Sequence, residues 1–297
     1  MTAITKYVGA GVEATYGTAV AATVYENIRS ETMKPLIEYS KRGGAGYAVE
    51  TAARASKEYS GGDLVWVPTE GGILHTILYN LFGSYTDSGT AYTYLEHDST
   101  VSHTFRCGRE THEHIFPGCV VERLELACRA GDYLVASTNL LGKKKDANGA
   151  LGTPSFDTTE GYHANDMTVT CNSATITGSI TDISIVFTRN HDQNEIGGGS
   201  TEFQRRPKQQ RYDISGSLNV RSYDSALETL LKNAGSFVIA GEWETTAGEK
   251  LTASLTVHAD ADNASGINER NVERHGISFF GVLDQGTGKA STVTLTH

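Results

Sequence analysis

Two amphipathic stretches with the same apolar spacing stand about half a chain apart. In residues 73–81 the apolar side chains follow the spacing i, i+1, i+4, i+5 and i+8, and residues 226–234 repeat that spacing. The positions are Ile73, Leu74, Ile77, Leu78 and Leu81 in the first stretch and Ala226, Leu227, Leu230, Leu231 and Ala234 in the second. In a helix of about 3.6 residues per turn, this spacing places every apolar residue on one face. Each stretch therefore predicts one helix that covers an apolar surface.

The residues around the two predicted helices also correspond. A short strand-like stretch precedes each helix, at 60–67 and 215–220, and a Gly-Ser pair follows it, at 83–84 and 235–236. Ile73 and Ala226, which occupy the same place on the stripe, are 153 residues apart. We interpret the repeated phrase as a tandem duplication of one small domain.

Most of the remaining pattern alternates with period two, which is typical of half-buried strands. The clearest hairpin is expected at 120–141, where Leu124, Leu126 and Cys128 alternate with charged residues before a turn at 130–132. Further strands are expected at 33–39, 92–95, 102–105, 176–187, 212–220, 237–243, 251–258, 276–280 and 291–295. The fold class is therefore mainly β (α+β), a sandwich or barrel with one flanking helix in each domain.

Three segments follow from this organisation. Residues 1–30 are small and polar, so we expect an extended N-terminal arm rather than a core element; the first domain is expected at 31–155 and the second at 156–297. Each domain carries a long polar excursion before its strand–helix phrase, at 41–57 and at 189–208, and we expect the first one to be flexible. Loops of that length in a compact domain are usually functional or disordered.

Composition narrows the class of protein. Gly accounts for 32 of 297 residues and Pro for only 5, which favours turn-rich β structure over disorder. The formal charge of −10 argues against a protein that grips nucleic-acid phosphates, because that affinity needs clustered Lys and Arg. No apolar run approaches ~18 residues, so no membrane span is expected, and no secretory signal is visible at the N-terminus. We expect the chain to be made and folded in a cytoplasm.

The four cysteines are too few, in too long a chain, to form a disulfide scaffold, and we expect reduced structural thiols. Cys107, His112, His114 and Cys119 lie close enough in sequence to consider a zinc site. Their spacing lacks the usual paired Cys-x2-Cys, so loop histidines and half-buried thiols are favoured over a metal site.

Other motifs point away from catalysis. Residues 9–14 match a G-x-G-x-x-A pattern, but the dinucleotide-binding interpretation needs a strand–helix–strand unit that the following residues do not supply. No G-x-S-x-G elbow and no phosphate-binding loop of the G-x-x-x-x-G-K-[ST] type occurs. The best basic patch contains Arg205, Arg206, Lys208 and Arg211, and we favour a contact with an acidic neighbour, such as another copy of this acidic chain, over a solvated loop.

The N-terminal phrase at 11–19, Gly-Val-Glu-Ala-Thr-Tyr-Gly-Thr-Ala, resembles the opening of tail tube proteins (major tail proteins) from long-tailed bacteriophages. The Gly/Thr-rich β body, the single flank helix and the long excursion between early strands are also similar to that family. The specific words cover about ten residues, whereas the similarity in organisation covers most of the chain.

This resemblance implies a structural virion protein without catalysis or cofactor. Each tail-tube-like domain is expected to add strands to a ring-wide inner β-barrel, with its helix outside, and the long excursion is expected to reach an adjacent ring. A ring of six such domains needs three chains that carry two each, so a homotrimer with pseudo-sixfold symmetry is expected, with a homohexamer as the alternative. The resemblance further implies stacked rings that form a conduit for DNA ejection, a tape measure protein as a partner, and assembly in the host cytoplasm into the virion tail. The negative charge suits a lumen that DNA passes without sticking.

The expected site is an interface between subunits and between rings. Its residues come from the N-terminal arm, the first excursion and the second excursion: Glu13, Tyr16, Lys41, Arg42, Arg54, Lys57, Glu195, Arg205, Arg206 and Lys208. The alternative function is a two-domain β-sandwich that binds carbohydrate or a cell surface through exposed aromatic side chains, for which the candidates are Tyr85, Tyr92, Tyr94 and Trp243.

Overall fold

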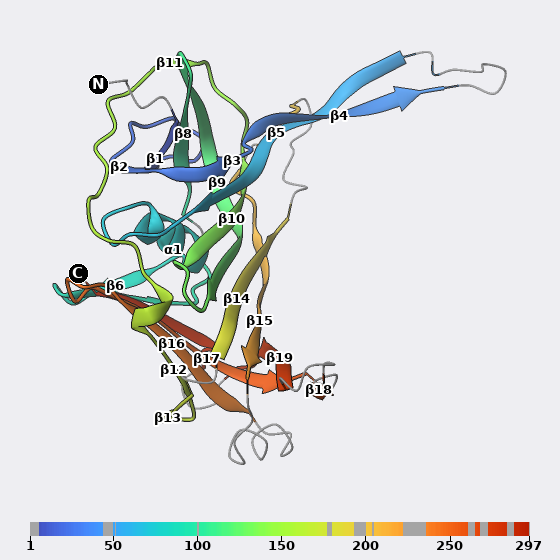
Figure 1. Cartoon of the computed structure of the whole chain (residues 1–297). Coiled ribbons are helices and arrows are strands. Elements are labelled where there is room, and N and C mark those ends of the chain that lie inside the picture. The colour runs from blue at the N-terminus through green and yellow to red at the C-terminus, as the bar shows by residue number, and fades with distance from the viewer. Residues whose placement is uncertain are drawn as a thin grey trace.

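The computed structural model describes residues 6–43, 50, 52–99, 101–176, 180–192, 200–203, 205–221, 236–260, 265–267, 273–283 and 288–296. Within these residues the chain forms antiparallel β-structure with one α-helix and one short 3-10 helix, which confirms the mainly β class. Figure 1 shows the path of the chain.

The first half of the chain contains β1 to β11 and the helix α1. Their bounds are β1 Tyr7–Val12, β2 Val24–Glu26, β3 Ile28–Glu31, β4 Lys34–Arg42, β5 Ala52–Trp66, α1 Leu74–Phe82, β6 Tyr85–Asp87, β7 Ala91–Leu95, β8 His103–Arg109, β9 His112–Arg129, β10 Val135–Gly142 and β11 Gly149–Ala150.

The second half begins with the 3-10 helix η1 and continues to β20. The bounds are η1 Ala164–Asp166, β12 Met167–Cys171, β13 Ala174–Thr175, β14 Ile180–His191, β15 Gln209–Val220, β16 Phe237–Glu244, β17 Lys250–Ala259, β18 Ser265–Ile267, β19 Glu273–Gly281 and β20 Ser291–Thr296.

One long ladder of strands joins the two halves. It runs β4–β5–β10–β9–β14–β15–β19, and every pairing in it is antiparallel. The halves meet where β9 pairs with β14, with Leu126 opposite Ile185 and Leu124 opposite Phe187. These facing side chains are all buried. The junction between the halves is therefore continuous sheet and not a flexible linker.

Two further groups of strands extend from this ladder. β1, β2, β8 and β11 join the first part of β9. β12, β16, β17, β20, β7 and β6 form the other group, near the C-terminus in Figure 1, which joins the ladder where β17 pairs with β19. β9 thus pairs with β8 through its first part and with β10 and β14 through its second.

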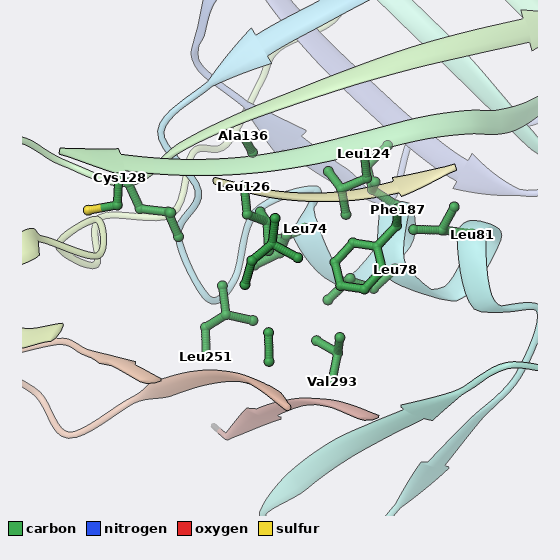
Figure 2. Packing of buried hydrophobic residues seen from close by; sticks show 14 of the residues in the cluster. Leu74, Leu78, Leu81, Leu124, Leu126, Cys128, Ala136, Phe187, Leu251 and Val293 are labelled. Atoms are coloured by element: carbon green, nitrogen blue, oxygen red, sulfur yellow. The ribbon is translucent and has the colours of Figure 1, made fainter. Parts of the chain in front are cut away.

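Helix α1 lies between two sheets. Figure 2 shows its side chains between Leu124 and Leu126 of β9 on one side and Leu251 and Val293 of β17 and β20 on the other. All five apolar residues of the predicted stripe are fully buried, and Gly83 ends the helix in the left-handed region at φ 81°. The predicted helix and its glycine stop are confirmed. The helix is enclosed more fully than a flanking helix, because sheet covers it on two sides.

The same five strand pairings occur in each half. β1–β8, β4–β5, β5–β10, β8–β9 and β9–β10 in the first half have the counterparts β12–β16, β14–β15, β15–β19, β16–β17 and β17–β19 in the second. The second predicted helix, at 226–234, lies outside the described residues.

The prediction for the N-terminal arm is wrong. The N-terminal arm was expected to stay outside the core, but Tyr7, Val8 and Ala10 in β1 are fully buried. Small residues make this possible, because a Cβ at Gly9 would lie 2.7 Å from the Cβ of Ala22. The G-x-G spacing therefore lets β1 pack closely against the segment that contains Ala22.

The described part of the first excursion is not a flexible loop. Residues 52–60 continue β5 outward and pair with β4 as far as Arg42 opposite Ala52, and the resulting hairpin projects to the upper right in Figure 1. We call β4 together with residues 52–59 of β5 the projecting hairpin. The expected strands at 33–39, 120–141, 237–243, 251–258, 276–280 and 291–295 are confirmed.

Candidate assembly surface

Glu13 stands at the centre of the N-terminal phrase, and its carboxylate is buried, with 4% of the residue exposed. Oε1 accepts hydrogen bonds from the Thr104 hydroxyl at 2.8 Å and the Gly118 N–H at 2.7 Å. Oε2 accepts from the Gly17 N–H and the Ser102 hydroxyl, both at 2.8 Å. Four donors at a buried carboxylate replace the hydration that it loses on folding. Glu13 therefore fixes the N-terminal turn to β8 and β9.

Tyr16 lies on the same turn and packs into a small apolar cluster with Val120, Leu141, Phe203 and Tyr59. Burial raises the pKa of the Tyr16 hydroxyl above its ordinary value. Gly118 makes room for the ring, because its φ is +70° and a Cβ there would lie 3.0 Å from Tyr16 Cε2. Glu13 and Tyr16 were expected to contact a neighbouring subunit. The structure gives both residues partners within the chain, and their contact with a neighbouring subunit stays a prediction.

The projecting hairpin carries exposed apolar side chains. Ile37 and Tyr39 on β4 are 48% and 56% exposed, and within the described ranges β5 is the only strand that pairs with β4. An exposed apolar pair on an edge strand is a candidate surface for association. Ile37 and Tyr39 are not among the expected site residues, although they alternate with polar residues in 33–39.

Three of the predicted cationic residues lie toward the outer end of this hairpin. Lys41 Nζ is 3.2 Å from a Glu50 carboxylate oxygen, and both side chains are more than half exposed. Arg42 pairs with Ala52 in the ladder, and Arg54 pairs with Ser40. The projecting hairpin therefore combines exposed apolar side chains with exposed basic ones.

Lys57, at the base of the projecting hairpin, is only 8% exposed. Its Nζ lies 4.6 Å from the centre of the Tyr59 ring and 5.3 Å from that of Phe203, and 3.6 Å from a Glu38 carboxylate oxygen. These are the distances of cation–π contacts and of an ion pair. Lys57 therefore has partners within the chain, and the contact between subunits expected of it stays a prediction.

The described end of the second excursion, residues 200–203 and 205–208, lies against the base of the projecting hairpin. We call it the strap. The Glu58 N–H donates to the Thr201 carbonyl at 2.7 Å, and Lys144 Nζ donates to Glu202 Oε1 at 2.5 Å. Phe203 is fully buried in the cluster that holds Tyr16. The strap thus contributes one backbone hydrogen bond to β5 and one aromatic ring to the small apolar cluster.

The structure brings four of the ten predicted site residues to one place. Glu13, Tyr16, Lys57 and Arg206 come together around the strap, where an Arg206 guanidinium nitrogen lies 3.4 Å from the Ser102 hydroxyl. Arg205 and Lys208 are exposed on the strap, and Glu195 lies outside the described residues. Phe203 and Tyr59, which complete the cluster, were missed because single aromatic residues in polar stretches give no periodic signal.

Loop histidines and half-buried thiols were expected in the Cys/His group, but Cys107 lies on β8 and His112, His114 and Cys119 lie on β9. Cys107 and Cys119 are fully buried, and burial raises the pKa of both thiols. Among the described residues no three or more His, Cys, Asp or Glu side chains gather as metal ligands.

In the described part of the chain no helix has the length and apolar character to span a membrane.

The aromatic surface of the alternative function is largely absent. Tyr94 and Trp243 were expected to be exposed, but both are fully buried. Tyr94 points into the region of α1, where its hydroxyl lies 2.5 Å from His75 Nδ1. Of the four candidates, only Tyr85 is exposed, at 39%.

Comparison with protein families identifies the family of the chain. A family model described as phage tail tube protein matches residues 4–279, which is nearly the whole chain. Comparison with curated proteins gave no match.

Proposed function

We propose that this chain, which belongs to the phage tail tube protein family, polymerises into stacked rings that form a conduit for DNA ejection. Family membership gives it a structural role in the tail. The ring geometry, the passage of DNA, the tape measure protein as a partner and assembly in the host cytoplasm belong to the proposal.

The observation that carries the proposal is the contrast between β14 and β4. β4 pairs with β5, and β14 pairs with β15. In each half the second of these strands leads into the predicted helix that a Gly-Ser pair follows. β14 also pairs with β9 on its other edge, and Ile185 and Phe187 are fully buried there. β4 has the same place in the first half but exposes Ile37 and Tyr39. A strand from a second copy of the chain that paired with β4, as β9 pairs with β14, would bury this surface.

The repeated pairings support two tube-like units at 31–155 and 156–297, with β1 from the N-terminal segment completing the first. A heterologous contact that repeats head to tail closes into a ring when the rotation fits. Two units per chain then favour a homotrimer with pseudo-sixfold symmetry, with the homohexamer as the alternative. The exposed basic residues Lys41, Arg42, Arg54, Arg205 and Lys208 are proposed to meet acidic surfaces of neighbouring copies, because the chain carries a net charge of −10.

The test is negative-stain microscopy of concentrated protein together with the mass of the smallest closed ring. Rings and tubes support the proposal, and discrete monomers at all concentrations contradict it. The variant Ile37→Ser with Tyr39→Ser is expected to fold normally and to stay monomeric. Leu283→Ser is the matched control, because Leu283 is 65% exposed and lies away from the projecting hairpin. A deletion across 193–206 is a poorer test, since it removes the buried ring of Phe203.

A further inference from the structure

The two units differ in one connection. In the first unit β8 begins at His103, so residues 85–102 intervene after the Gly83-Ser84 pair that ends the helix phrase. In the second unit β16 begins at Phe237, directly after the corresponding Gly235-Ser236 pair. The extra residues of the first unit contain the hairpin β6–β7, and we call the described residues 85–99 the clasp.

The clasp leaves its own unit and joins the sheet of the other. β7 pairs with β20 over five residue pairs, from Ala91 opposite Thr296 to Leu95 opposite Thr292. The Tyr94 ring, which faces the core, is fully buried, and so is Val293 opposite it. The first unit therefore lends a hairpin to the outer sheet of the second, near the C-terminus in Figure 1.

Polar contacts fasten the end of the clasp to the start of β20. Glu96 accepts hydrogen bonds from the Ala290 N–H at 3.1 Å and from the Ser291 hydroxyl at 2.7 Å. Lys289 Nζ donates to the Glu96 carbonyl. One residue of the first unit thus holds three consecutive residues of the second, which aligns β20 with β7.

A buried arginine from the second unit also binds the end of the clasp. Arg189 of β14 is fully buried and donates to the carbonyls of His97 at 2.9 Å and Ser99 at 2.7 Å. It also donates to the carbonyls of Asn80 and Leu81 at the end of α1. A buried guanidinium is costly unless its donors are engaged, so losing these contacts would be strongly destabilising. Arg189 therefore couples the clasp, the end of α1 and the junction strand β14.

From these contacts we propose that residues 85–99 act as an intrachain clasp that sets the angle between the two tube-like units before assembly. The inference rests on the proposed ring of units. The second unit has no residues corresponding to 85–102. A junction between the second unit of one chain and the first unit of the next therefore cannot be fastened in this way. Clasped junctions within chains then alternate with unclasped junctions between chains around the ring.

The clasp is tested first in the unassembled chain by hydrogen exchange. Wild-type amides of 91–95 and 291–296 are expected to be protected together, and Glu96→Ala is expected to speed exchange of both segments about tenfold while leaving α1 unchanged. Asp87→Asn is the matched control, because Asp87 lies on the same hairpin and accepts from the Gly89 N–H rather than from β20. Rapid exchange of 91–95 in the wild type, or no effect of Glu96→Ala on β20, overturns the clasp.

The second readout is ring size. The wild type is expected to give rings of one size, whereas Glu96→Ala with Arg189→Met is expected to give a mixture of closed rings and open arcs. Rings of unchanged, uniform size from that variant overturn the role of the clasp in setting the angle. A wild type that forms no rings contradicts the proposed function instead, and the exchange experiment still decides whether the clasp exists.

Discussion

The Glu13 carboxylate accepts a hydrogen bond from the Gly118 N–H at 2.7 Å, across 105 residues of sequence. This contact explains the N-terminal phrase that resembles the tube family. Its acidic residue accepts hydrogen bonds from four donors inside its own chain. The phrase therefore stabilises the fold of its own chain.

Replacing Glu13 by Gln is expected to destabilise the folded chain by about 2–4 kcal/mol, because an amide cannot accept from all four donors and brings donors of its own. Urea unfolding of the unassembled protein measures the change. Glu110→Gln is the control, since Glu110 is exposed in the turn between β8 and β9. Equal stability of Glu13→Gln and the control would show that Glu13 acts elsewhere.

Phe203→Ala is expected to cost about 3 kcal/mol and to release the strap, because the ring fills the cluster around Tyr16 and Tyr59. Limited proteolysis should then cut between 200 and 208 more rapidly than in the wild type. Phe280→Ala, at a residue that is 47% exposed, is expected to change stability by less than about 1 kcal/mol. An uncut strap in the Phe203→Ala variant would contradict the anchoring role.

Reversing charge on the projecting hairpin, with Lys41→Glu and Arg54→Glu, is expected to slow assembly without unfolding the chain. Both residues lie on its outer part, and repulsion from an acidic neighbour opposes docking. Light scattering follows assembly, and thermal unfolding checks the fold. Arg129→Glu with Arg123→Glu changes the net charge equally on the body of β9. The same slowing in that control would assign the effect to total charge and not to the projecting hairpin.

His103 predicts a loss of stability in mild acid. Its Nδ1 lies 2.7 Å from the Asn80 amide nitrogen, and burial lowers the pKa of His103 to about 3. Asn80 Oδ1 accepts from the Val121 N–H, so the amide nitrogen donates and Nδ1 must stay unprotonated. The unfolded chain binds the proton near pH 6.5 and the folded chain does not, so stability falls as the pH drops below about 6.5.

At pH 5 this linkage amounts to about 2 kcal/mol relative to pH 7. The variant His103→Gln is expected to show a shallower fall in the free energy of unfolding between pH 7 and pH 5. His112→Gln, at an exposed position on β9, should retain the wild-type slope. A wild-type slope in His103→Gln would place the acid sensitivity in other groups.

Periodic patterns predicted the regular elements because burial on one face imposes them. The stripe at 73–81 and the hairpin at 120–141 are examples, since in both the core contacts alternate with solvent at the period of the element. The outer part of β5 escaped prediction because residues 52–56 are exposed or half-buried, so no buried face imposes an apolar alternation on them.

The interface residues were harder to predict for a different reason. A charged residue in a polar stretch has the same sequence signal whether it is buried, as Glu13 and Lys57 are, or exposed, as Arg205 is. Only the donors around Glu13 and the rings around Lys57 distinguish the cases, and these come from segments distant in sequence. Ile37 and Tyr39 were visible as an alternating pair, but the pattern gave no indication that their face lacks a cover.

The strand β9 has a mechanical consequence. Its second part pairs with β10 on one edge and β14 on the other, and its first part pairs with β8 and β11. A load applied along β9 shears several antiparallel ladders at once, and many backbone hydrogen bonds must break together. Tension along this strand is therefore shared between both halves of the chain, and separating the halves requires breaking the β7–β20 pairing as well as β9–β14.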